Sequence, residues 1–153
     1  MKIKNIPVIV KKSPIAGKGV FATEHIKKGI RLLEYKGERR EWAGFTEDDD
    51  NYVCLFSVSD DIVIDPARTG NPARFVNHSC APNCEAILDD GRVYIESVRP
   101  IKPGEELFYD YSLQLAHKPT KADMKKYECR CGSSNCRGTM LEIPSPKKTK
   151  PAP

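Results

Sequence analysis

The chain has 153 residues, of which 39% are hydrophobic and 30% charged, and a formal net charge of +4 at pH 7. This length is typical of one domain that buries most of its unfolded surface and folds without a partner. No apolar run approaches the roughly 20 residues of a membrane-spanning helix, and Asn5 and Pro7 interrupt the apolar N-terminal stretch, so we expect neither a membrane protein nor a secretory signal.

Charged residues are distributed unevenly along the chain. Residues 41–61 hold seven acidic side chains and no Lys or Arg, so the rest of the chain is strongly basic. We therefore expect two surfaces of opposite sign. The acidic run at 47–50 fits a solvated loop, and it also fits an acidic field that attracts a basic peptide. The sequence leaves both interpretations open.

Three short strands are expected in the first half of the chain. Residues 3–10 are rich in β-branched side chains, with Pro7 indicating an edge or a bulge. Residues 30–35 and 62–65 are the next two candidates. The pattern is weakest over 38–61, where the expected inward-facing anchors are Trp42, Phe45, Tyr52 and Phe56.

Two glycines stand one residue apart in Gly17-Lys18-Gly19, just before the apolar run Val20-Phe21-Ala22. Glycine lets the backbone approach a ligand that a Cβ would exclude, but the same pattern is common in plain turns. The third glycine of the dinucleotide-binding pattern is absent. Taken alone, the motif leaves a turn and a ligand contact both open.

The stretch RFVNHSCAPNC, residues 74–84, gathers an Arg, an Asn, a His and two Cys, and we expect the chemistry of the chain here. Asn71-Pro72 reads as an N-cap followed by proline at the first helical position, which predicts a short helical turn. Pro82 prevents a regular helix further on. Asn77 and His78 are therefore predicted to form a fixed polar pair between regular elements.

Turn signals divide the next part of the chain. Asp89-Asp90-Gly91 predicts a hairpin between two short strands. Ile101-Lys102-Pro103-Gly104 places proline and glycine as a type II turn requires, and a strand over 105–111 should follow. Because side chains alternate along a strand, Tyr109 and Tyr111 share one face. Two neighbouring tyrosines are then available for one site.

The cysteines indicate a metal site. Six cysteines would allow three disulfides, but Cys129, Cys131 and Cys136 are closely spaced, and a chain of this length does not need disulfides to fold. A closed structural zinc site has four tetrahedral ligands, so a fourth must come from elsewhere. Spacing does not choose among the remaining cysteines, Cys54, Cys80 and Cys84. We expect zinc and a reducing, intracellular compartment.

Four motifs in order carry a family resemblance: GKGVFA, RFVNHSC with PNC, GEELFYDY and CRCGSSNC. Over 3–138 the chain resembles the SET-domain protein lysine methyltransferases that end in a post-SET zinc motif. The resemblance implies a mainly β fold of several short sheets, with a threaded, pseudoknot-like C-terminal segment and a small zinc motif. It also implies four regions, which are a SET domain at 3–113, a linker at 114–128 with a helical turn from Thr120, a post-SET motif at 129–143, and a disordered Lys/Pro-rich tail at 144–153.

Roles for individual residues come from the same resemblance. It assigns binding of S-adenosyl-L-methionine to Lys18, Gly19, Val20, Arg74, Asn77 and His78, and more loosely to Tyr52. It makes Tyr111 the catalytic tyrosine, gives Tyr109 control of the number of methyl groups, and places Tyr35 in the lysine channel. It names Cys80 as the fourth zinc ligand beside Cys129, Cys131 and Cys136, which leaves Cys54 and Cys84 as packed thiols.

The implied activity is methyl transfer from S-adenosyl-L-methionine to a lysine ε-amine of a basic protein or peptide, such as a histone, with mono- or dimethyl-lysine as product. No cysteine-rich segment precedes residue 3, so we do not expect the pre-SET zinc cluster of some relatives, and their histone-site preferences do not carry over. One rival is a non-catalytic zinc module that binds basic peptides. Another is a small basic zinc protein that binds nucleic acid, which the absence of stacking aromatics within the basic runs disfavours. The sequence leaves the oligomeric state open.

Overall fold

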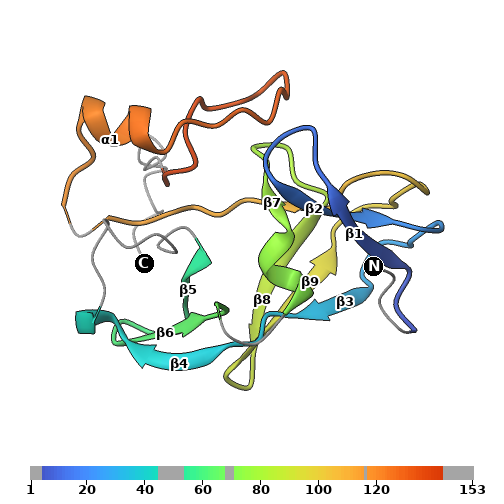
Figure 1. Cartoon of the computed structure of the whole chain (residues 1–153), viewed down its shortest axis with the longest axis horizontal. Helices are drawn as coiled ribbons and strands as arrows, with labels where there is room; N and C mark the ends of the chain where they lie inside the picture. Colours follow the sequence, from blue (N-terminus) through green and yellow to red (C-terminus); the bar gives the residue numbers. More distant parts are fainter. Residues whose placement is uncertain (1–4, 45–53, 68–70, 116, 143–153) are drawn as a thin grey trace, which may run out of the picture.

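A computed structural model describes residues 5–44, 54–67, 71–115 and 117–142 (Figure 1). The predictions for Phe45, Tyr52, the acidic run at 47–50 and the tail at 144–153 concern residues outside this described part. The described chain is mainly β, which confirms the predicted fold class. Its strands are β1 (Val8–Lys12), β2 (Lys18–Ala22), β3 (Arg31–Glu34), β4 (Glu38–Glu41), β5 (Phe56–Ser57), β6 (Ile62–Asp65), β7 (Asn77–His78), β8 (Cys84–Asp89), β9 (Arg92–Ser97) and β10 (Phe108–Tyr109). Its helices are the 3-10 turns η1 (Trp42–Gly44) and η3 (Pro72–Phe75) and the α-helix α1 (Lys121–Lys126).

Within the described residues the strands form four small sheets. Two are antiparallel three-stranded sheets in the orders β3-β9-β8 and β4-β6-β5, one is the antiparallel pair β1-β2, and one is the parallel pair β10-β7. The predicted hairpin joins β8 to β9, and its central residues Asp90 and Gly91 have φ of 49° and 73°. Positive φ at both positions is the type I′ geometry that matches the twist of the flanking strands.

One core lies between the β1-β2 pair and the β3-β9-β8 sheet. Fully buried side chains come from both, including Val8, Val20, Val93 and Ile95. In β9 alternate residues face this core, as the period of two in a strand requires. β2 extends this core toward η3, and β7 follows η3 directly, so the core holds the segments that contain the predicted cofactor residues.

The strand predicted over 105–111 is wrong in extent. Glu106 forms only an isolated bridge with Phe21, and the ladder to β7 is limited to Phe108 and Tyr109. Between these pairings the buried Asn83 side chain takes the place of a strand partner, because it donates to the Glu106 carbonyl at 2.8 Å and accepts from the Phe108 N–H at 2.8 Å. A side chain that completes a ladder leaves no periodic signal in the sequence.

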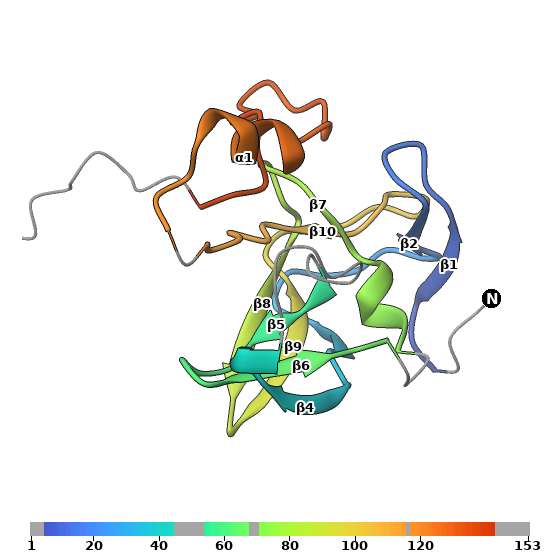
Figure 2. The same ribbon diagram turned by 60° about the vertical axis from the view of Figure 1, so that its left-hand side comes forward.

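The C-terminal part contains the helix α1. The helix begins at the N-cap Thr120, whose side chain accepts from the Asp123 N–H while the Asp123 carboxylate accepts from the Thr120 N–H, so the predicted helical turn is confirmed. A bridge from Leu113 to the fully buried Leu141 returns the segment to the body of the protein. Figures 1 and 2 show α1 at one end of the molecule and the β4-β6-β5 sheet at the other. None of the helices in the described part of the chain is long and apolar enough to cross a membrane.

Candidate functional site

Five aromatic rings from four separate strands and strand ends form a continuous row. The centroid distances are 5.3 Å from Tyr35 to Phe56, 6.4 Å from Phe56 to Tyr109, 4.7 Å from Tyr109 to Tyr111, and 5.3 Å from Tyr111 to His78. We call these five residues the aromatic row. The parallel pairing of β10 with β7 brings Tyr109, Tyr111 and His78 together, since Tyr109 pairs with His78 in register. The predicted neighbours Tyr109 and Tyr111 do lie side by side.

Two of the three phenols of the aromatic row are held by backbone carbonyls, and all three stay protonated. Tyr35 donates its hydroxyl to the Cys54 carbonyl at 2.5 Å, and Tyr111 donates to the Val76 carbonyl at 2.6 Å. Burial raises the pKa of Tyr35, Tyr109 and Tyr111 above its usual value. Neutral phenols can orient a substrate by hydrogen bonding but do not act as bases near pH 7.

His78 fixes the backbone on which Tyr111 sits. Its Nδ1 accepts from the Tyr111 N–H at 2.9 Å. Burial lowers the pKa of the imidazole, so the ring is neutral, and an accepting Nδ1 requires that Nε2 carry the hydrogen. That Nε2 lies 3.5 Å from the Cys80 Sγ. The side chain predicted to help bind the cofactor is therefore committed on both nitrogens to protein atoms.

Asn77 and His78 were predicted to lie between regular elements, but they form the strand β7. The Asn77 side chain ties the glycine motif to this strand. Its Nδ2 lies within hydrogen-bond distance of the Ala16 carbonyl at 3.2 Å, the Lys18 carbonyl at 3.1 Å and the Glu106 carboxylate at 2.8 Å. The side chain thus organises the turn before β2. The Nδ2 of Asn77 is therefore committed to protein atoms, as the two ring nitrogens of His78 are.

Gly19 has a structural reason to be glycine. A Cβ built there would lie 2.1 Å from Glu106 Oε1 and 3.1 Å from the Cβ of Ser13. Glu106 is buried, and its carboxylate also accepts from the Ser13 hydroxyl at 3.0 Å. Sequence reasoning considered a ligand contact or a plain turn for this glycine and missed the carboxylate packed against it.

Two cations gather near the glycine motif. The Lys18 Nζ lies 5.4 Å and the Arg74 guanidinium carbon 5.0 Å from the centroid of the Phe75 ring. Arg74 also donates to the Ala67 carbonyl at 3.4 Å. Val20 is fully buried, and its carbonyl accepts from the Leu107 N–H at 2.7 Å. The structure therefore brings Lys18, Arg74 and the Asn77-His78 pair to one region, while Tyr52 lies outside the described residues.

Four cysteine sulfurs converge at the C-terminal end. The Sγ atoms of Cys80, Cys129, Cys131 and Cys136 all lie within 4.8 Å of one another. Cys80 is 3.7 Å from Cys129 and 4.0 Å from Cys136. Zinc–sulfur bonds of about 2.3 Å in a tetrahedron place the sulfurs about 3.8 Å apart, so the donor set and its size fit zinc.

N–H groups surround the cluster and would stabilise thiolates, while burial raises the pKa of the Cys80 and Cys129 thiols. The backbone N–H groups of Arg137, Cys131 and Gly138 donate to the sulfurs of Cys80, Cys129 and Cys136 at 3.3, 3.4 and 3.4 Å. Burial works against ionisation of Cys131, but hydrogen bonds, led by that of the Ser133 hydroxyl at 3.2 Å, lower the pKa of its thiol to about 5. Thiolate is the form that binds a metal.

The remaining cysteines lie elsewhere. Cys84 belongs to β8 and is 1% exposed, and burial raises the pKa of its thiol to about 12. Cys54 is half-buried, and its carbonyl is the acceptor for Tyr35. Of the three cysteines that spacing left open as a fourth ligand, only Cys80 lies with the cluster.

An ion pair next to the cluster was not predicted. The Arg137 guanidinium donates to both oxygens of Asp110, at 2.7 and 3.0 Å. Burial of Asp110 works against its charge, but the hydrogen bonds from Arg137 lower the pKa of the carboxyl below its usual value. Both residues stand beside predicted site residues, Tyr111 and Cys136, and this adjacency was the available signal. Phe56 was predicted only as an anchor, and its place in the aromatic row depends on the sheet arrangement.

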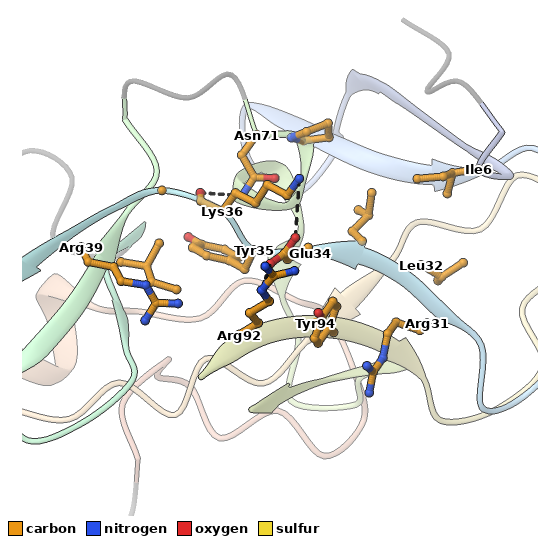
Figure 3. Close-up of a pocket in the computed structure, with 14 residues that line it drawn as sticks. Ile6, Arg31, Leu32, Glu34, Tyr35, Lys36, Arg39, Asn71, Arg92 and Tyr94 are labelled. Carbon is orange, nitrogen blue, oxygen red and sulfur yellow. Dashed lines mark hydrogen bonds and ion pairs between the residues drawn. The ribbon is translucent and has the colours of Figure 1, made fainter. Parts of the chain in front are cut away.

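A groove of about 810 Å³ lies beside β3 and β9, and of the predicted site residues only Tyr35 lines it. Figure 3 shows the Tyr35 ring among Lys36, Arg39 and Arg92. The Glu34 carboxylate lies 3.5 Å from the Lys36 amine and 3.8 Å from the Arg92 guanidinium. The groove borders one end of the aromatic row and does not coincide with it.

Comparison with known proteins gives consistent matches. A family model described as the SET domain matches residues 17–112. Histone-lysine N-methyltransferase 2D of Homo sapiens is 36% identical over 143 residues, which cover 87% of this chain and 2% of that protein. The H3 lysine-4 specific histone-lysine N-methyltransferase of Schizosaccharomyces pombe is 40% identical over 131 residues, which cover 78% of this chain and 14% of that protein. Histone-lysine N-methyltransferase trithorax of Drosophila melanogaster is 35% identical over 137 residues, which cover 82% of this chain and 4% of that protein. The chain thus spans a small part of the length of these relatives.

Proposed function

The chain belongs to the SET-domain family, and we propose that it is a protein-lysine N-methyltransferase that uses S-adenosyl-L-methionine and methylates a basic protein or peptide. The observation that carries the proposal is the aromatic row from Tyr35 to His78, which adjoins the region that holds the glycine motif and Asn77. The relatives bear the name histone-lysine N-methyltransferase, so a histone is the first substrate to test.

The aromatic row is suited to a lysine side chain. Only a neutral amine can attack a methyl group, and with a reference pKa near 10.4, deprotonation at about pH 7.4 costs roughly 4 kcal/mol. Burial among Tyr35, Phe56 and Tyr109 desolvates an ammonium and reduces this cost. A separate general base is then not required, and the neutral phenols of the row agree with this.

The cofactor, when bound, supplies an electrophilic methyl group on a positively charged sulfonium. We assign its binding to the backbone of Lys18, Gly19 and Val20 and of the Asn77-His78 pair. We assign its carboxylate to Lys18 and Arg74, the two cationic side chains beside the Phe75 ring. The Asn77 Nδ2 and both His78 ring nitrogens are bonded to protein atoms, so we assign the contact with the cofactor to the backbone of this pair.

Tyr111 orients the reacting amine in this proposal. Its hydroxyl is fixed by the Val76 carbonyl and its backbone by His78, so the ring has one orientation. Holding donor and acceptor in line contributes several kcal/mol to such a transfer. Tyr109 lies 4.7 Å away and limits the space for a methylated amine, so we assign mono- or dimethyl-lysine as the product.

Zinc is assigned a structural part. The four cysteines that converge on one point would hold it, and all four protein ligands leave no open position for a substrate. We also propose the boundaries given by the motifs, with a SET domain at 3–113, a linker at 114–128 and a post-SET motif at 129–143. Zinc binding then folds the segment that closes the molecule beside β7 and β10.

The test is incubation of the purified protein with labelled S-adenosyl-L-methionine and a histone mixture, followed by mass spectrometry of the products. Methyl-lysine on a histone supports the proposal. Binding of the cofactor and of histone peptides without any transfer would instead support a non-catalytic module. Absence of cofactor binding by calorimetry would reject the proposal at its first step.

A further inference from the structure

Two hydrogen-bonded connections run from the four-cysteine cluster to the segment that bears Tyr111. The first passes through His78, whose Nε2 lies 3.5 Å from the Cys80 Sγ and whose Nδ1 accepts from the Tyr111 N–H. The second passes through Arg137, which follows Cys136 directly in the chain. Its N–H donates to the Cys80 Sγ at 3.3 Å, and its guanidinium grips both oxygens of Asp110.

The Arg137–Asp110 pair has the geometry of a strong contact. Both hydrogen bonds are short and parallel, and both side chains are largely shielded, with 25% and 31% exposed. A bidentate pair of this kind fixes orientation as well as distance. The Asp110 carboxylate continues the connection, because its Oδ1 accepts from the Ser112 N–H at 2.9 Å. Asp110 therefore sets the backbone on both sides of Tyr111.

The pair also controls the charge beside His78. The Asp110 Oδ1 lies 3.7 Å from His78 Nδ1, the nitrogen that must accept from the Tyr111 N–H. An unpaired carboxylate at this distance would compete with His78 Nδ1 for the Tyr111 N–H. Arg137 supplies the compensating positive charge, and its own position is set by Cys136 and Cys80.

We propose that Asp110 and Arg137 are positioning residues that couple occupancy of the four-cysteine site to the placement of Tyr111. Neither residue offers a sulfur to the metal. The inference rests on the proposed function for its relevance to catalysis, but the coupling itself is a property of metal binding and backbone order. Linkage makes the coupling reciprocal: the factor by which zinc binding favours the ordered Tyr111 segment is the factor by which that order strengthens zinc binding. A substitution at Asp110 that breaks the connection should therefore weaken zinc binding.

The full chain offers a matched control. Arg130 and Glu128 form an ion pair at 3.5 Å within the same cysteine-rich segment, with side chains 79% and 56% exposed. Their pair has the same charges but does not reach the Tyr111 segment. Arg130→Gln therefore tests the loss of one cation near the cluster without the loss of the connection.

The first measurement is zinc affinity, by competition with a chromophoric chelator. We expect Asp110→Asn and Arg137→Gln each to lower the zinc affinity about tenfold, the usual effect of losing a hydrogen-bonded charge pair. Arg130→Gln should change the zinc affinity less than about twofold. The double variant should be little weaker than either single one. Unchanged zinc affinity in Asp110→Asn, or additive effects in the double variant, would overturn the coupling.

The second measurement is amide exchange in protein labelled with ¹⁵N-tyrosine. The Tyr111 N–H donates to His78, whereas the Tyr35 N–H donates to the Val93 carbonyl in the core and serves as the internal reference. Removing zinc, or substituting Arg137→Gln in zinc-loaded protein, should raise Tyr111 exchange about tenfold and leave Tyr35 unchanged. Arg137→Lys keeps the positive charge but not the planar guanidinium that bonds both oxygens of Asp110, so it should restore part of the protection of the Tyr111 N–H. Equal Tyr111 exchange with and without zinc would refute the proposal.

The methyl-transfer arm separates the two proposals. In zinc-loaded Arg137→Gln we expect kcat to fall while KM for the cofactor stays within about twofold, because misplacement of Tyr111 affects the reacting geometry more than binding. If the unmodified protein transfers no methyl group to any substrate, the proposed function fails. The zinc and exchange measurements still decide the coupling in that case.

Discussion

Gly19 is glycine because a buried carboxylate occupies the space of its Cβ. Gly19→Ala would push against Glu106 Oε1, and overpacking of this kind costs about 1–3 kcal/mol. We expect a lower melting temperature and weaker cofactor binding, since Asn77 and Lys18 share the same hydrogen-bond network. Thermal unfolding and calorimetry measure the two effects.

The control for this prediction is a change at Glu106. In a Glu106→Ala background, Gly19→Ala should cost clearly less, with the 3.1 Å approach to Ser13 as the remaining obstacle. Glu106→Gln keeps the atoms in place and should give no relief. If the penalty of Gly19→Ala is the same in all three backgrounds, the carboxylate is not the reason for the glycine.

Tyr111→Phe separates the hydroxyl from the ring. The substitution removes the hydrogen bond to the Val76 carbonyl, which stabilises the fold by about 1 kcal/mol, and keeps the contact with Tyr109. We expect the methyl-transfer rate to fall about 100-fold through loss of alignment, with little change in cofactor affinity. Tyr94→Phe, on β9 and outside the aromatic row, is the matched control and should retain activity. Normal turnover by Tyr111→Phe would contradict the catalytic assignment.

Tyr109 tests the product state. Its ring lies between Phe56 and Tyr111, so its hydroxyl takes up volume beside the proposed amine position. Tyr109→Phe should shift the products toward higher methylation with little loss of overall rate. Intact-mass analysis of one peptide over a full time course gives the distribution for both proteins. Trimethyl-lysine from the unmodified chain, or the same distribution from both, would assign the limit to other residues.

At the scale of elements, local signals were sufficient where one segment determines its own shape. Asn71-Pro72 predicted a helical turn, and the turn forms with Asn71 as its N-cap accepting from the Ala73 N–H at 3.2 Å. The hairpin at Asp90-Gly91 and the type II turn with Gly104 at φ 86° likewise follow from a few neighbouring residues. Contacts between distant segments, such as Arg137 with Asp110 or Phe56 with Tyr109, have no local signal and required the structure.

The segment 105–111 shows the same limit and leads to a prediction. Asn83, 1% exposed, completes the ladder there with two hydrogen bonds. Asn83→Ala would leave the Glu106 carbonyl and the Phe108 N–H unsatisfied, at about 1–3 kcal/mol each. Denaturant unfolding should show this loss. Asn83→Asp keeps the acceptor for the Phe108 N–H but turns a carboxylate oxygen toward the Glu106 carbonyl and buries a charge, so it should be at least as destabilising as Asn83→Ala. A clearly smaller loss in Asn83→Asp than in Asn83→Ala would contradict this expectation.

At the scale of the whole molecule, two different sets of interactions stabilise the fold, and they meet near β7. The β1-β2 pair and the β3-β9-β8 sheet share a buried apolar core that contains Cys84. The C-terminal part instead depends on the cysteine cluster, the Arg137–Asp110 pair and the bridge from Leu113 to Leu141. Removal of zinc should therefore loosen the second part and leave the first folded.

Cysteine labelling tests this division directly. With zinc bound, the four cluster thiolates are protected from iodoacetamide, and Cys84 is protected by burial and by a thiol pKa raised to about 12. After chelation at about pH 8, mass mapping should find Cys80, Cys129, Cys131 and Cys136 labelled together while Cys84 stays unlabelled until denaturant is added. Because each site is mapped separately, labelling of Cys54 does not enter the comparison. Labelling of Cys84 at the same rate as the cluster would show that zinc holds the whole fold, and cluster labelling that is independent of the chelator would show that the cysteines hold no metal.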